Sequence, residues 1–150
     1  MDAAERLRGI HLEDVHGRRV ALSSLGGTAL VVVYAGRRGA DAAITVGRAL
    51  EARFGGRTGA PAARILPVAC LGEVPAFFRG LARARIRAAA AGVEILIDFE
   101  RALERAIGMQ PAVANIAVLD GGGSLIGVMT GVDESCVTQV ALVIGRITGA

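Results

Sequence analysis

The chain has 150 residues, an apolar content of 53% and a net charge of +3 at pH 7, and all 17 of its basic residues are arginine. This length and composition predict a single domain over residues 1–150 with an aliphatic core, and they exclude intrinsic disorder. Aromatic residues make up only 3% of the chain, which argues against stacking on nucleic-acid bases as its main function.

The first 17 residues carry charges throughout and lack the apolar segment of a secretory signal. No apolar run approaches the ~20 residues that a membrane helix needs. The two cysteines are too few for a disulfide framework and lack metal-ligand spacing. We therefore expect a cytoplasmic protein with no metal site or cofactor and no membrane among its partners, and the sequence leaves its oligomeric state open.

At the start of the chain, residues 2–9 form either a short helix or a lead-in. Residues 10–15 and 18–22 flank His16 and Gly17, a turn signal that predicts a β-hairpin.

The next stretch predicts a strand, a turn and a helix. Residues 29–34 are apolar or aromatic and rich in β-branched side chains, which is typical of a strand buried on both faces. Asp41 is expected at the N-cap or in the first turn of the following helix. The apolar stripe predicted for that helix contains Ile44, Ala49, Leu50 and Phe54.

The remaining elements follow from similar patterns. Residues 55–62 predict a loop, and residues 64–71 a second buried strand in which Pro67 requires an unpaired side or a bulge. The chain then continues with a helix that ends at residue 91, a strand at 93–97 and a helix at 99–107 capped by Asp98. Strands at 114–119 and 125–130 follow, and Asp133 caps a last helix. This order predicts an α/β fold, with an N-terminal β-hairpin and a mixed central sheet covered by helices on both faces.

Several short motifs occur in an order that resembles one family. The hairpin contains Leu12, Asp14, Gly17, Val20, Leu22 and Leu25, and it is followed by Val31–Ala35, Ile95–Asp98, Ala102, Leu103, Ile107, Gly108, Val118–Asp120, Gly123 and Gly131. This series resembles the redoxin-type thioredoxin-fold proteins, which include peroxiredoxins and membrane-anchored thiol–disulfide oxidoreductases. The resemblance implies a thioredoxin-like sandwich.

The same resemblance shows where this chain departs from the family. Aligning Tyr34 with the family's strand places Arg38 and Asp41 at the two positions of the active-site Cys-x-x-Cys motif, and no cysteine lies between Tyr34 and Phe54. Ala114 stands at the position of the family's cis-proline, and we expect a trans peptide bond there. Thiol chemistry needs a thiolate at the helix N-terminus, so the resemblance implies a degenerate member without that activity.

The substituted turn suggests a binding function instead. Arg37 and Arg38 precede a helix N-terminus, and Gly39 frees the backbone, so this turn could hold an anion. Our first hypothesis is a redox-inactive module that binds a protein or a small anion through the former active-site face. Its candidate ligand-binding residues are Arg37, Arg38, Gly39, Asp41 and Ala114. The alternative for the turn is a local surface ion pair between Arg38 and Asp41.

The cysteines supply a second hypothesis. Cys70 follows the second core strand and could approach the turn, so it is the candidate nucleophile of an atypical thiol peroxidase or thiol–disulfide oxidoreductase. The alternative is a small buried hydrophobe, which is also our interpretation of Cys136. The thioredoxin-like strand order puts the two cysteines about three strands, or ~14 Å, apart. A disulfide needs Cα atoms within ~7 Å, so we expect no bridge between them.

Arg79, Arg83 and Arg87 recur at intervals of four residues on one helix. They could form a patch for phosphates or an acidic partner, or a solvated outer face.

Overall fold

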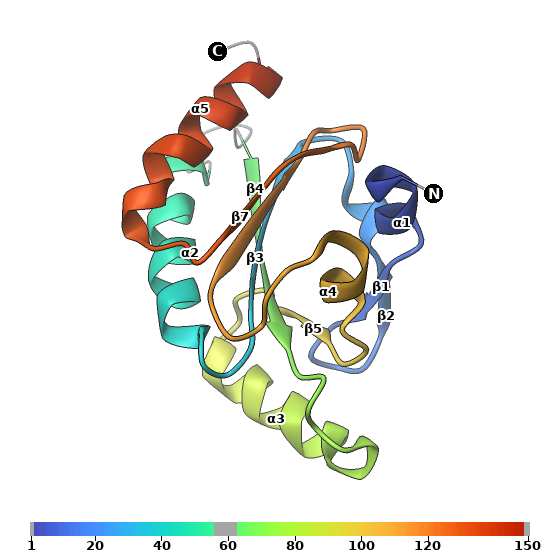
Figure 1. The fold of residues 1–150 in the computed structure, drawn as a ribbon. Helices are drawn as coiled ribbons and strands as arrows, with labels where there is room; N and C mark the ends of the chain where they lie inside the picture. Colours follow the sequence, from blue (N-terminus) through green and yellow to red (C-terminus); the bar gives the residue numbers. More distant parts are fainter. Residues whose placement is uncertain (1, 56–62, 149–150) are drawn as a thin grey trace.

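A computed structural model describes residues 2–55 and 63–148 of the chain (Figure 1). Its strands are β1 (His11–Glu13), β2 (Arg19–Ala21), β3 (Ala29–Ala35), β4 (Ala63–Cys70), β5 (Leu96–Asp98), β6 (Asn115–Leu119) and β7 (Leu125–Thr130). Its helices are α1 (Ala3–Arg8), α2 (Ala40–Phe54), α3 (Arg79–Ala90), α4 (Ala102–Ile107) and α5 (Val137–Thr148), with 3-10 turns η1 (Leu22–Leu25), η2 (Ala76–Phe78) and η3 (Glu134–Cys136). Apart from Gly55, the predicted loop 55–62 lies outside the described residues.

The strands form one mixed sheet in the order β2-β1-β5-β4-β3-β6-β7. Strand β3 lies parallel to β4 and antiparallel to β6. Every residue of β3 is buried, which confirms the prediction of a strand covered on both faces. The N-terminal hairpin of β1 and β2 and the closing hairpin of β6 and β7 are also as predicted. The fold is therefore the predicted α/β arrangement.

Pro67 is tolerated in β4 because one side of the strand is open at that point. Pro67 pairs with Val33 of β3, but β5 begins to pair with β4 only at Val68. The missing amide hydrogen of proline therefore removes no bond to β5. The prediction of a strand with an unpaired side is confirmed.

Two hydrophobic cores lie on opposite faces of the sheet, beneath different helices (Figure 1). The first core contains Leu7 of α1 and Leu103 of α4. The second contains Val46 and Leu50 of α2 together with Val140 and Ile144 of α5. Helix α3 contributes no buried residue to either core and lies at one end of the molecule. No helix among residues 2–55 and 63–148 has the length and apolar character to cross a membrane.

One part of the predicted stripe on α2 is wrong. Ile44 is exposed, whereas Val46 and Leu50 are fully buried. Helix α2 begins at Ala40, directly after its N-cap Gly39, and this start turns Val46 and Leu50 toward the sheet. Phe54 packs at the edge of the second core as expected.

Asp98 caps α4 from a buried position. Its carboxylate accepts hydrogen bonds from the backbone N–H of Ala102 at 3.0 Å and of Leu103 at 3.1 Å. Helix α4 begins at Ala102, three residues later than predicted, because Arg101 adopts a left-handed conformation with φ of 54°. Asp133 makes the equivalent bond to the backbone of Ser135, but it does so at the exposed surface.

We expect Asp98→Ala to lower the free energy of unfolding by about 2 kcal/mol or more, because it leaves two backbone N–H groups without an acceptor in a dry site. Asp133→Ala is the matched control, and water can replace its carboxylate, so its loss should be about 1 kcal/mol or less. Chemical denaturation of the two variants measures both values. Equal losses would contradict the assignment of Asp98 as the more important cap.

Candidate functional site

The turn that joins β3 to α2, where the resemblance places the active-site motif, is packed tightly against a second loop. The backbone N–H of Gly36 donates to the carbonyl of Pro111 at 2.7 Å. A Cβ on Gly36 would lie 2.8 Å from that carbonyl oxygen, and one on Gly39 would lie 2.5 Å from the carbonyl carbon of Val113. Both glycines are therefore needed for the close approach of two backbones.

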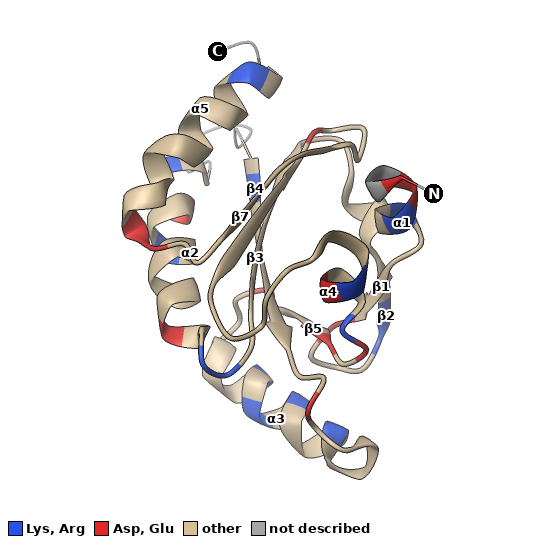
Figure 2. Cartoon of the chain, in the orientation of Figure 1, with Lys and Arg blue, Asp and Glu red and all other residues tan. Residues whose placement is uncertain are grey.

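Two unpaired cations stand at the outer side of this turn. Arg37 and Arg38 are exposed, and neither makes an ion pair with any described residue. Asp41 is exposed in the first turn of α2, and the alternative of an Arg38–Asp41 ion pair is not formed. Gly39 gives α2 no side-chain cap. Figure 2 shows this basic turn directly before α2.

Ala114 lies behind Gly39, fully covered, and its peptide bond is trans as expected. Its carbonyl accepts a hydrogen bond from the N–H of Val132 at 3.0 Å. The structure therefore brings Arg37, Arg38, Gly39 and Asp41 together in one turn. Ala114 supports that turn from beneath and offers no exposed group of its own.

Asn115 is the residue of this region that the sequence reading missed. It is fully buried, and its side-chain amide donates to the carbonyl oxygens of Tyr34 at 3.1 Å and Gln110 at 2.7 Å. Its side-chain oxygen accepts from the N–H of Gln110 at 3.0 Å. These bonds hold the loop after α4 against the end of β3. The available signal was a lone polar residue at the start of an otherwise apolar strand.

Cys70 lies close to the turn but inside the first core. It is 7% exposed and stands opposite Asp98 in the register of β4 and β5. Among the described residues the Tyr34 hydroxyl has no hydrogen-bond partner of good geometry, and the Cys70 thiol is one of the groups that influence its pKa. Burial raises the pKa of Tyr34 far above its usual range, and Cys70, Asp98 and Glu104 raise it further. Tyr34 is therefore neutral at any physiological pH.

Cys136 lies on the other face of the sheet, where it packs at the edge of the second core. Cys70 belongs to the first core, so the sheet separates the two thiols. Both cysteines are free, which confirms the expectation that no bridge joins them.

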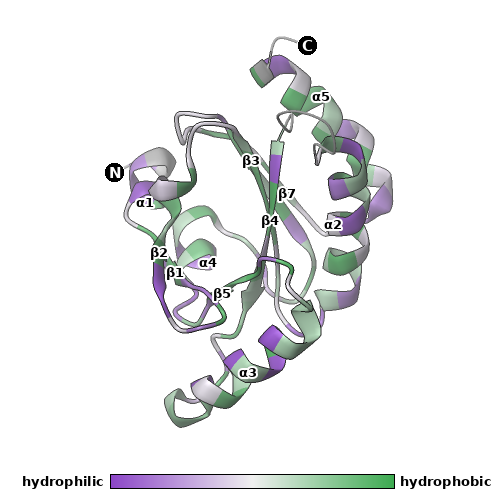
Figure 3. Ribbon diagram, turned by 180° about the vertical axis from the view of Figure 1, so that it is seen from behind, coloured by the Kyte–Doolittle hydropathy of each residue, from purple (hydrophilic) through white to green (hydrophobic). Residues whose placement is uncertain are grey.

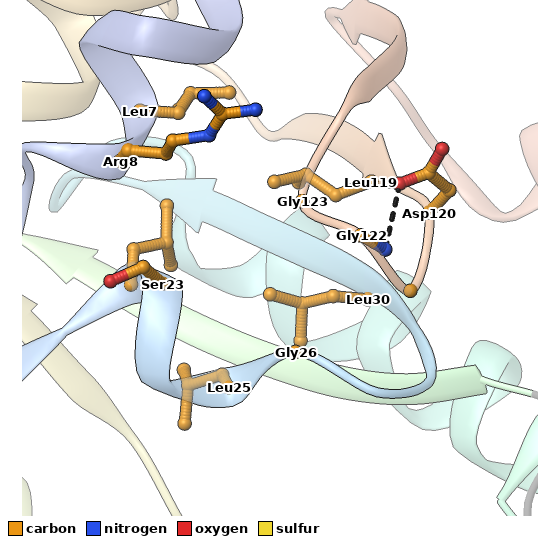
Figure 4. A pocket seen from close by; sticks show the side chains of 12 residues that line it. Leu7, Arg8, Ser23, Leu25, Gly26, Leu30, Leu119, Asp120, Gly122 and Gly123 are labelled. Atoms are coloured by element: carbon orange, nitrogen blue, oxygen red, sulfur yellow. Dashed lines mark hydrogen bonds between the residues drawn. The ribbon is translucent and has the colours of Figure 1, made fainter.

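The two described cavities lie away from the turn. One, of about 150 Å³, is at the opposite end of β3, between α1, η1 and the loop after β6 (Figure 4). Its only carboxylate, on Asp120, already accepts bonds from the N–H groups of Gly122 and Ser124. The other borders the N-terminal hairpin and the segment before β5. Within the described residues, no group of three or more His, Cys, Asp or Glu side chains is placed to hold a metal ion.

We expect Gly39→Ala to lower the free energy of unfolding by about 1–3 kcal/mol, because the new methyl group collides with the backbone of Val113 and Ala114. Gly47→Ala in the same helix is the control. A Cβ there meets nothing within 4 Å, so alanine should stabilise the helix by about 0.5–1 kcal/mol. Thermal denaturation distinguishes the two substitutions, and a stable Gly39→Ala variant would contradict the packing described here.

No family model and no curated protein matches the chain. Solved structures do match it across most of its length. An uncharacterized thioredoxin-like protein from Porphyromonas gingivalis has a TM-score of 0.66 and 16% identity, covering 93% of this chain and 90% of its own. A secreted thiol-disulfide isomerase from Corynebacterium glutamicum has a TM-score of 0.63 and 17% identity, covering 91% and 83%. A secreted disulfide oxidoreductase from Mycobacterium tuberculosis has a TM-score of 0.59 and 11% identity, covering 95% and 98%. The chain therefore has the thioredoxin-like fold.

Proposed function

We propose that this chain is a redox-inactive thioredoxin-like domain that binds an anionic group, on a protein or a small molecule, through the turn Gly36–Asp41. The observation that carries the proposal is the pair of exposed, unpaired arginines at the start of α2. The first backbone N–H groups of a helix lack intrahelical acceptors and carry partial positive charge. Guanidinium groups beside them add charge-assisted donors for a carboxylate or phosphate.

The shape of the turn supports an exposed ligand. Arg37, Arg38 and Asp41 are all exposed, so a group bound to them would stay partly in water. The tight contact of Gly36 and Gly39 with the loop before β6 fixes the backbone without using the arginine side chains. A rigid turn with two free cations suits a carboxylate or phosphate carried by a larger partner.

The absence of a thiol from the turn supports a function other than redox exchange. Arg38 and Asp41 occupy the positions where the resemblance places the two cysteines, and neither side chain can form a disulfide. The positive end of α2, which would stabilise a thiolate, follows Arg37 and Arg38 and carries Asp41 in its first turn.

The alternative function is thiol chemistry at Cys70. Its supporting observation is the Tyr34 hydroxyl, which is buried without a good hydrogen-bond partner and lies near the thiol. The burial of Cys70 among aliphatic side chains and its position opposite the Asp98 carboxylate favour a structural thiol. We therefore rank this function second.

Anion binding can be tested by titrating the protein with inorganic phosphate, with chloride at equal ionic strength as the reference. Amide resonances of Ala40, Asp41 and Ala42 should shift with phosphate. Arg37→Ala combined with Arg38→Ala should weaken binding at least about tenfold, because charge-assisted bonds are lost. Arg48→Ala removes an exposed charge from the same helix and is the control. If Arg48→Ala weakens phosphate binding as much as the double variant does, the overall charge of the protein explains the binding. That result would contradict a site at the turn.

Redox inactivity can be tested separately by thiol titration of the native protein. We expect Cys70 to stay unmodified in a Cys136→Ser variant until denaturant is added, because reagent cannot reach a thiol packed inside the first core. Peroxide consumption and disulfide reduction should equal those of a Cys70→Ser variant. Rapid formation of a sulfenic acid on native Cys70 would instead establish the alternative function.

A further inference from the structure

Helix α3 turns two of its arginines, Arg79 and Arg83, toward the protein. The guanidinium carbons of Arg79 and Arg83 lie 5.0 Å and 5.2 Å from the centre of the buried Phe99 ring, a cation–π geometry. A nitrogen of Arg79 lies 3.0 Å from the carboxylate of Glu100, and one of Arg83 lies 2.8 Å from that of Glu13. One interpretation of the sequence placed these arginines on a solvated side of the helix. That interpretation is wrong for Arg79 and Arg83, which anchor the helix to the rest of the protein.

The large apolar side chains of this segment face water as a consequence. Phe77 is 80% exposed, Leu81 is 52% exposed and Phe78 is 49% exposed. The two phenylalanine rings lie 4.5 Å apart and form one apolar projection. Helix α3 itself buries no residue, and Figure 3 shows apolar bands along it and along the segment before it. We call Phe77, Phe78 and Leu81 the outer face of α3.

Two exposed arginines, Arg85 and Arg87, accompany the outer face on α3, whereas Arg79 and Arg83 are paired with Glu100 and Glu13. Residues 74–93 contain four arginines and no aspartate or glutamate. Arg85 is exposed and makes no ion pair with any described residue, and Arg87 beside it donates only to the carbonyl of Val15. Figure 2 shows basic segments on α3 with no acidic one between them. The complementary partner is therefore anionic and has an apolar layer that accepts phenylalanine.

A two-fold dimer formed through this face does not meet this requirement. A two-fold contact would place the outer face of one α3 against that of the other, so that Arg85 and Arg87 would face their own equivalents. With no carboxylate on the helix, these charges would repel.

We propose that the outer face of α3 docks on an anionic phospholipid surface. Peripheral helices bind such surfaces by inserting Phe and Leu at the level of the headgroups while Arg contacts the phosphates. The outer face suits this mode because it projects from one end of the molecule (Figure 1), and because no described cavity contains its three side chains. The surface is separate from the turn Gly36–Asp41, so the inference goes beyond the proposed function.

The test uses the whole chain and two kinds of vesicle, phosphatidylcholine alone and phosphatidylcholine mixed with phosphatidylglycerol. The protein should sediment with the mixed vesicles only, and high salt should release it. Phe77→Ser or Leu81→Ser should lower binding about tenfold, and Arg85→Gln should lower it about fivefold. Leu142→Ser is the matched control, because Leu142 is a 63% exposed apolar residue on α5.

Three results would overturn the proposal. The first is that the protein does not bind the mixed vesicles. This includes the case in which the protein is a dimer that Phe77→Ser converts to a monomer. The second is equal loss of binding in Leu142→Ser and Phe77→Ser. The third is an equal loss when Arg37 and Arg38 are replaced by alanine, which would mean that overall charge drives the binding. All substituted side chains are exposed, so the variants should keep the parent denaturation curve, and this can be checked directly.

Discussion

Strand β3 hydrogen-bonds to β4 on one side and to β6 on the other, and its side chains alternate between two separate cores. Val32 and Tyr34 enter the core beneath α1 and α4, whereas Val31 and Val33 enter the core beneath α2 and α5. A shift of one residue would exchange these two sets, so the register is strongly fixed. The turn that follows Ala35 inherits this fixed position, and the loop before β6 is tied to it through Asn115 and Gly36.

The N-terminus of α2 could activate a thiol at the end of β3, but the residues that stand there are arginines. A helix N-terminus at the end of β3 favours negative charge, which in a thiol enzyme is the thiolate itself. In this chain Arg37 and Arg38 add positive charge to the positive end of α2, and no side chain caps the helix. Asp41 in the first turn of α2 supplies one negative charge, so the turn keeps a net positive charge, which is the basis of the proposed anion binding. This is a physical reason to connect the altered motif with binding instead of electron transfer.

Local patterns carried most of the fold prediction, and distant contacts account for part of its errors. Apolar runs and turn residues located the strands, and the chemistry of proline correctly required an open side at Pro67. The residues of the turn before α2 could be predicted from the sequence because the resemblance aligns them directly after β3. The hydrogen bond from Asn115 to Tyr34 spans 81 positions and the ion pair from Arg83 to Glu13 spans 70, so sequence spacing gave no sign of either. Ile44 was misplaced because the packing of α2 on the second core selects Val46 and Leu50, and the sequence alone does not show which face of the helix meets the sheet.

The orientation of α3 follows from those distant contacts. Rotating the helix to bury Phe77 and Leu81 would bring Arg79 and Arg83 into water and break their contacts with Phe99, Glu100 and Glu13. The exposed apolar surface is thus held in place by polar and cation–π interactions on the opposite side of the same helix. It also differs in kind from the turn before α2, which offers hydrogen-bond donors but no apolar side chain. An anion at the turn gains from directed bonds, whereas a partner of α3 gains from apolar burial together with charge. In the two proposals the surfaces would therefore select different partners, although both are positive.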